Sequence, residues 1–405
     1  MSLPDGDFTS GLDGLCDWLR GGPEELDLAP AVLELLRRGR WGLLTHSAAV
    51  DLYLRPSLTA LRSAGAPLAA LFGPEHGVRG AAAAGEHVAS GTDPATGLPV
   101  YSLYGVTRRP TPEMLQGLEI LVVDLQDVGT RFYTYAATLS LVMEAAAEQE
   151  IPVVILDRPN PIGGRVVEGP MLEPAYASFV GPHPTPIRHG LTLGELGRLF
   201  HAQYGVGAEP HVIPVRDWGD RDLWPLERAW APPSPNIPTP DAALLYPGVG
   251  LLEGTNLSEG RGTAKPFEWV GAPWIEPERW RDALAGLALP GVAFRPIDFV
   301  PTTSKHAGVP CGGVQIHLMQ RDAVRSVSVG AALLATARRL WPAEFAWLET
   351  GGRFKVDRLA GNDRFRGAID AGTPLSEMEA EWAAAHARFA GPRARAVLYG
   401  HPARA

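Results

Sequence analysis

Short apolar runs alternate with longer segments of helical period between residues 40 and 215, and this alternation constrains the fold most strongly. Runs this short and this uniformly apolar are typical of strands buried on both faces. Four of them are expected to be strands, at residues 41–45, 67–71, 119–123 and 152–156. Helices are expected at 132–149 and at 192–203, where Thr192 and Glu195 have the spacing of a capping box. The pattern predicts βαβ units around a parallel sheet.

The length of the chain and a change of pattern along it predict two domains. A chain of 405 residues is longer than one hydrophobic core usually organises. The segment 230–240 contains too many prolines for a helix or a central strand. Beyond it, we expect helices at 277–287, 327–340 and 375–389 and strands at 292–299 and 312–318. The predicted division is a parallel-sheet α/β domain in residues 1–240 and a second, smaller α/β domain in residues 241–405.

Charge and cysteine content exclude several kinds of partner. The net charge of -9 makes nucleic acid and anionic membrane surfaces poor partners, because phosphate binding needs clustered cations. Cys16 and Cys311 lie outside any metal-ligand spacing, so we expect two buried, reduced thiols.

The first residues carry acid where a secretory signal carries base, which favours residence in the cytoplasm.

Polar residues gather directly after the expected strands, and ligands bind beyond the carboxyl ends of parallel strands. Further polar residues lie at 188–189, ahead of the capped helix, and in the irregular loop 253–263. The strand-end candidates are Glu75, His76 and Arg79, then Asp124, Asp127 and Arg131, and finally Asp157, Arg158 and Asn160.

Structural roles compete with these functional ones. Glu75 and His76 could only fix their own loop, Asp127 could cap the next helix, and Asp157 could pair with Arg158. His46, His183 and His317 stand alone in the sequence and are assigned no role.

Familiar cofactor and nucleophile motifs are missing from the sequence. It has no G-x-G-x-x-G after a first strand, no G-x-x-x-x-G-K-[ST], no G-x-S-x-G and no H-E-x-x-H. We therefore expect no cofactor and no metal. What remains is carboxylate chemistry, and glycoside cleavage is the obvious reaction that needs positioned carboxylates without a cofactor.

Six segments resemble those of the NamZ-type exo-β-N-acetylmuramidases, and the resemblance runs in the same order from about Gly42 to the C-terminus. They are 71–80, 124–135, 156–164, 232–239, 253–263 and 271–275. The resemblance implies a Rossmann-like N-terminal domain, a smaller C-terminal α/β domain and an active site between them, without a nucleotide. It also implies release of terminal N-acetylmuramic acid from the non-reducing end of peptidoglycan fragments, with Glu75 as the catalytic glutamate. Members of this family are often secreted.

The predicted mechanism starts with Glu75, which would protonate the leaving glycosidic oxygen. Asp127 or Glu259 would act as nucleophile or base, unless the acetamido group of the substrate assists instead. An arginine should bind the lactyl carboxylate, with Arg79, Arg131, Arg158, Arg188 and Arg261 as candidates. The full set of predicted substrate-binding residues is His76, Arg79, Asp124, Arg131, Tyr133, Arg158, Asn160, Arg188, His189, Asn236, Asn256 and Arg261.

Two rival functions also fit these residues. One is a non-catalytic muropeptide-binding protein. The other is a hydrolase that holds magnesium or manganese through Asp124, Asp127, Asp157 and His76.

Overall fold

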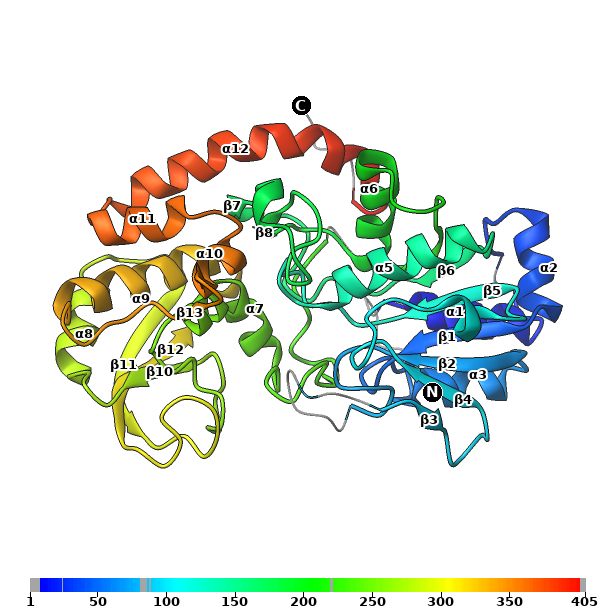
Figure 1. The fold of residues 1–405 in the computed structure, drawn as a ribbon, viewed down its shortest axis with the longest axis horizontal. Helices are drawn as coiled ribbons and strands as arrows, with labels where there is room; N and C mark the ends of the chain where they lie inside the picture. Colours follow the sequence, from blue (N-terminus) through cyan, green and yellow to red (C-terminus); the bar gives the residue numbers. More distant parts are fainter. Residues whose placement is uncertain (1–7, 24, 81–85, 87–88, 219–220, 401–405) are drawn as a thin grey trace.

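The computed structural model describes residues 8–23, 25–80, 86, 89–218 and 221–400, which form two parts side by side (Figure 1). The first part is built on a seven-stranded sheet with the order β3-β4-β2-β1-β5-β6-β9. Its strands are β1 (Trp41–Thr45), β2 (Leu68–Gly73), β3 (Gly91–Thr92), β4 (Pro99–Ser102), β5 (Ile120–Asp124), β6 (Val153–Leu156) and β9 (His211–Ile213).

The topology of this sheet is the doubly wound one. All of its strand pairs are parallel except β3–β4 at one edge. From β1, the chain adds β2 and β4 on one side and then β5, β6 and β9 on the other, which is the strand order of Rossmann domains. The predicted Rossmann-like sheet is confirmed, and its four predicted strands end within two residues of the observed ones.

Both faces of the sheet are covered, as the apolar runs predicted. Leu43 and Leu71 point to a core shared with helices on one face, whereas Leu44 and Phe72 point to the core on the other. The covering helices are α1 (Gly11–Leu19), α2 (Pro30–Arg38) and α3 (Ser57–Ser63) on the first face, and α5 (Tyr135–Glu148) and α6 (Leu193–Tyr204) on the second.

The two predicted helices of this part begin differently. At α6 the capping box is confirmed, because the Thr192 hydroxyl accepts from the Glu195 N–H and the Glu195 carboxylate accepts from the Thr192 N–H. Helix α5 begins at Tyr135, three residues later than predicted, and the Thr134 side chain does not cap it. Residues 130–134 instead form turns, and the Thr134 hydroxyl at their end hydrogen-bonds with Glu75.

The second part is a three-stranded antiparallel sheet with helices, in the order β10-β12-β11. Residues 230–239 contain neither helix nor strand, as predicted, but α7 follows at once, with Thr239 as its cap and Pro240 at its first position. The helices and strands are α7 (Pro240–Val249), α8 (Pro277–Ala285), α9 (Ser326–Leu340), β10 (Trp269–Ala272), β11 (Val292–Phe299) and β12 (Cys311–Leu318).

The last helix, α12 (Leu375–Ala396), crosses from the second part back to the first (Figure 1). It packs against α9, then against β7 (Glu168–Met171), and finally against α6. Strand β7 pairs with β8 (Pro186–Arg188). The remaining elements are short: α4 (Pro112–Leu115), α10 (Lys355–Ala360), α11 (Arg364–Ala371), β13 (Glu349–Thr350) and β14 (Arg353–Phe354).

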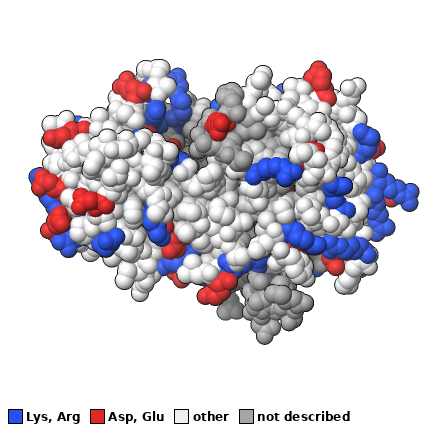
Figure 2. Space-filling view, turned by 90° about the horizontal axis from the view of Figure 1, so that it is seen from below, with Lys and Arg blue, Asp and Glu red and all other residues white. Residues whose placement is uncertain are grey.

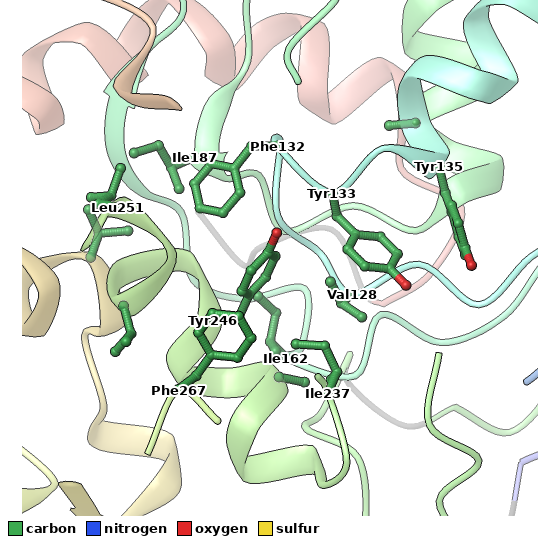
Figure 3. Close-up of a cluster of buried hydrophobic side chains, with 14 of the residues drawn as sticks. Val128, Phe132, Tyr133, Tyr135, Ile162, Ile187, Ile237, Tyr246, Leu251 and Phe267 are labelled. Atoms are coloured by element: carbon green, nitrogen blue, oxygen red, sulfur yellow. The ribbon is translucent and has the colours of Figure 1, made fainter. Parts of the chain in front are cut away.

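An aromatic cluster fills the junction between the two parts (Figure 3). The ring of Tyr246 from α7 lies 5.1 Å from that of Phe132 and 4.8 Å from that of Phe267. At Gly250 a side chain would meet the ring of Phe132 at 2.7 Å, so the backbone approaches this cluster closely. One apolar core runs through the junction, and the domain division at residue 240 stays a prediction.

Charged groups are mixed over the face shown in Figure 2. Basic and acidic side chains both occur there, separated by wide neutral areas, and no continuous basic surface is seen on this face. Within the described residues, no helix is both long and apolar enough to cross a membrane.

Candidate active site

Glu75 lies two residues beyond the end of β2, on a tight loop. His76 and Gly77 both have a positive φ, of 71° and 74°, which turns the chain back so that the Gly77 N–H donates to the Pro74 carbonyl at 2.9 Å. A histidine in this conformation is strained, and such strain gathers at functional sites. The imidazole of His76 is buried, whereas Glu75 is partly exposed.

Hydroxyl groups from two other segments hold Glu75 in place. The Thr134 hydroxyl donates to Glu75 Oε2 at 2.7 Å, which explains why Thr134 does not cap α5. The Tyr104 hydroxyl also hydrogen-bonds with Glu75, and the pKa of Tyr104 is raised by burial and by the charge of that carboxylate. The carboxylate is therefore oriented, and it sits at the positive end of α5.

His46 links the ends of β1 and β5, where the strand order reverses. Its Nε2 accepts from the Gln126 N–H at 2.9 Å, and its Nδ1 lies 3.0 Å from the Tyr135 hydroxyl. Burial lowers the pKa of His46 well below its usual range, so the ring is neutral. The Tyr135 hydroxyl also reaches the Glu75 carbonyl at 3.4 Å. This network ties the Glu75 loop to the switch point of the sheet.

Asp127 is a second carboxyl group at this edge. Its Oδ2 accepts from the Gly129 N–H at 2.7 Å, so it shapes a turn and does not cap the next helix. Its Oδ1 is buried without a hydrogen-bond partner among the described residues. Burial raises the pKa of Asp127 to about 7. The charges of both Asp127 and Glu75 raise the pKa of Tyr135 beyond the effect of burial, so the two carboxyl groups flank one tyrosine.

Asp124 and Arg158 form an ion pair in the interior. The Arg158 Nε lies 2.5 Å from Asp124 Oδ1, and its Nη1 donates to the Val50 carbonyl. The suggested pairing of Asp157 with Arg158 is wrong, because Asp157 accepts from Thr192 and Gly194 at the start of α6. Both members of the buried pair have internal partners, and substrate binding by Asp124 and Arg158 stays a prediction.

Two further predicted arginines are buried within the protein. Arg188 pairs with Glu168 at 2.8 Å and donates to the Ile162 carbonyl. Arg131 donates to three backbone carbonyls, and burial lowers its pKa to about 9. Both guanidinium groups support the β7–β8 region, and substrate binding by these two arginines stays a prediction.

Three other predicted binding residues also have internal partners. The Asn160 amide binds the Leu191 carbonyl and the Ile162 N–H. The Asn256 amide binds the backbone of residues 344 and 346. His189 Nδ1 accepts from the Leu191 N–H, and burial lowers the pKa of His189 to about 3. These bonds stabilise loops, and substrate binding by the three residues stays a prediction.

The second part contributes a charge cluster of its own. Arg261 pairs with Glu253 at 2.6 Å and with Glu259 at 3.2 Å, and Lys305 lies 2.9 Å from Glu259. Glu259 is buried between two cations, so it is a poor candidate for the second catalytic carboxylate. The charge of Arg261 is already balanced by two carboxylates.

Tyr246 stands between this cluster and the sheet. Its pKa is raised by burial and by Glu253, with smaller contributions from Glu75 and Asp127. Groups from both parts of the chain therefore meet around Tyr246, and an active site between the two parts stays a prediction. The predicted Tyr133 is buried here and donates to the Pro233 carbonyl at 2.9 Å. Asn236 lines a hollow of about 560 Å³ with residues of the loop 262–269.

Sequence reasoning missed Thr134, Tyr104, His46 and Tyr246. Tyr104 follows β4, a strand that is only partly buried and was not predicted. His46 directly follows β1, and that position was the available signal. Within the described ranges, no three His, Cys, Asp or Glu side chains come together as a metal site.

The first part is a doubly wound domain with carboxyl groups at its switch point, and it faces a smaller α/β domain. These features define a two-domain α/β protein with a carboxylate-centred site. The chain belongs to the exo-β-N-acetylmuramidase NamZ family. The N-terminal profile of that family matches residues 41–241, and the C-terminal profile matches residues 244–399.

Individual relatives agree with this family membership. The chain is 46% identical over 374 residues to the peptidoglycan β-N-acetylmuramidase NamZ of Bacillus subtilis (strain 168), covering 92% of this chain and 90% of the relative. Two crystal structures of DUF1343 family proteins from Bacteroides fragilis NCTC 9343 share the fold. One has a TM-score of 0.85 at 32% identity and the other 0.74 at 28%, each covering 98% of this chain and 100% of its own.

Proposed function

We propose that the protein is an exo-acting glycoside hydrolase that releases terminal β-linked N-acetylmuramic acid from the non-reducing end of peptidoglycan fragments. The observation that carries this proposal is the Glu75 carboxylate, held by Thr134 at the carboxyl edge of the sheet within a chain of this family. A non-catalytic binding protein and a metal-dependent hydrolase are not favoured. Cytoplasmic residence stays a prediction, which cell fractionation would test.

Glu75 is assigned the role of the acid that protonates the leaving glycosidic oxygen. It is a carboxylate at this edge that is partly exposed and held by a side-chain hydroxyl. A general acid contributes a rate factor of roughly 10²- to 10⁴-fold.

Asp127 is the better candidate for the second role, as nucleophile or base, because Glu259 is taken up by two cations. The role requires the ionised form, and burial raises the pKa of Asp127 to about 7. The rate is therefore expected to fall as the pH drops through about 7.

The test offers the protein a chromogenic β-N-acetylmuraminide and the matching β-N-acetylglucosaminide. We expect cleavage of the muraminide by the wild type and a loss of roughly 10²- to 10⁴-fold in the Glu75→Gln variant. Glu278→Gln, an exposed change on α8, is the matched control and should retain full activity. Cleavage of neither substrate, or normal activity of Glu75→Gln, would contradict the proposal. Proton NMR of the first product would then show retention or inversion at the anomeric carbon.

A further inference from the structure

Arg108 is a cation close to Glu75 that the mechanism above does not use. It lies on the loop that follows β4, and the start of this loop is fixed beside the Glu75 loop by a hydrogen bond from the Leu103 N–H to the Gly73 carbonyl at 2.8 Å. The Arg108 guanidinium lies 4.3 Å from the ring of Phe179 and 5.5 Å from the ring of Tyr104. The hydroxyl of that same Tyr104 hydrogen-bonds with Glu75. A single tyrosine therefore connects Arg108 to the catalytic carboxylate.

The charge of Arg108 is not balanced by a carboxylate. Its side chain is exposed, and no acidic group of the described part of the chain lies within ion-pair distance of it. The next residue, Arg109, differs, because its guanidinium lies 2.5 Å from Glu148. Two aromatic rings lie beside the Arg108 guanidinium, and its planar fork of N–H groups suits a planar anion.

The arginines predicted from the sequence do not provide an exposed, unbalanced positive charge near Glu75. Arg131, Arg158 and Arg188 are buried and donate to internal partners. Arg79 pairs with Asp93, and Arg261 pairs with Glu253 and Glu259. None of these five combines exposure, proximity to Glu75 and an uncompensated charge.

N-acetylmuramic acid differs from N-acetylglucosamine by a lactyl ether that carries a carboxylate. Building on the function proposed above, we infer that Arg108, seated on Tyr104 and Phe179, binds this carboxylate and selects N-acetylmuramic acid over N-acetylglucosamine. The arrangement places the group that would bind the lactyl carboxylate against the ring of Tyr104, whose hydroxyl hydrogen-bonds with the carboxylate that acts on the glycosidic bond. A planar guanidinium suits this role because it can bind a carboxylate through two parallel N–H groups.

The test compares a chromogenic muraminide that has a free lactyl carboxylate with the same compound as its lactyl carboxamide. The wild type should prefer the acid by roughly 10- to 100-fold in kcat/KM, the range of a charge-assisted hydrogen bond. In Arg108→Gln this preference should disappear through a loss of rate on the acid, with the carboxamide unaffected. Arg108→Lys should recover part of it, since the charge remains without the planar fork.

Arg37→Gln is the matched control. Arg37 also stacks on an aromatic ring, at 4.6 Å from that of Trp18, but it lies on α2, away from Glu75. It should leave both rates unchanged. An equal loss on acid and carboxamide in Arg108→Gln, or no loss on either, would overturn the inference.

A failure of the proposed function would give a different result from a failure of the inference about Arg108. If the wild type cleaved neither compound, calorimetry with N-acetylmuramic acid itself would decide the role of Arg108. Binding must then be weaker in Arg108→Gln than in the wild type, and equal binding would refute the assignment.

Discussion

The buried carboxyl group of Asp127 allows one substitution to change stability and activity in opposite directions. Asp127→Asn keeps an oxygen that can accept from the Gly129 N–H, but it removes the ionisable group. Because burial raises the pKa of Asp127 to about 7, the folded protein holds this proton more tightly than the unfolded chain does. The stabilisation from that proton is complete below pH about 4 and is lost as the pH rises through about 7.

The size of the effect follows from the shift. The pKa rises from 3.8 to about 7, and each unit corresponds to about 1.4 kcal/mol, so ionising Asp127 in the folded state costs up to about 4 kcal/mol. Asparagine has no proton to lose. The free energy of unfolding of Asp127→Asn should therefore exceed that of the wild type by up to about 4 kcal/mol at pH 8, and the difference should shrink towards pH 4.

Urea unfolding at several pH values between 5 and 8 measures this difference, and activity is assayed on the same samples. Asp298→Asn, an exposed change on β11, is the control and should stay within about 0.5 kcal/mol of the wild type throughout. Activity of Asp127→Asn should fall by about 100-fold or more if Asp127 has the proposed role of nucleophile or base. A variant that is destabilised at pH 8, or whose stability follows the pH dependence of the wild type, would refute the reasoning. Full activity would remove Asp127 from the catalytic site.

Two further predictions concern the scaffold around the site, and both are measured by urea unfolding. Arg158→Leu leaves the buried Asp124 carboxylate without its partner and should lower the free energy of unfolding by about 3–5 kcal/mol. The double variant with Asp124→Leu should recover most of this loss. An unchanged free energy of unfolding in the single variant would show that the pair is not charged. Gly248→Ala places a methyl group 1.7 Å from the Ser326 carbonyl oxygen where α7 crosses α9, and should cost about 1–3 kcal/mol. Gly286→Ala, whose methyl group meets nothing closer than 3.5 Å, should be neutral or slightly stabilising, and equal effects of the two would contradict the close packing.

The parallel sheet and the place of Glu75 were predictable because strands buried on both faces leave uniform apolar runs. The polar residues at the ends of such runs then mark the edge where ligands bind. Weakly apolar strands leave no such mark. Strand β4, Pro99–Ser102, is only partly buried, and missing it meant missing Tyr104 and Arg108.

The internal partners of the arginines were not predictable because a sequence does not show which charges meet inside the fold. Arg158 finds Asp124 at a separation of 34 residues, and Arg131 donates to a carbonyl 228 residues further on. The polar, glycine-containing loops after the strands were predicted from the sequence. Only the folded structure distinguishes a guanidinium that is buried in the interior from an exposed one that lies beside aromatic rings.

The C-terminal segment that follows α12 has a consequence for synthesis on the ribosome. The Tyr399 hydroxyl donates to Asp157 at 2.6 Å and accepts from the Val215 N–H, and the Leu398 N–H donates to Glu195, so the sheet domain is completed by a segment 242 residues downstream of Asp157. While the ribosome still covers these residues, α6 and the segment that follows β9 lack partners that they have in the finished protein. The first domain therefore closes only after residues 398 and 399 have left the ribosome, and a stop codon ahead of residue 398 would leave Glu195, Asp157 and Val215 without these hydrogen bonds.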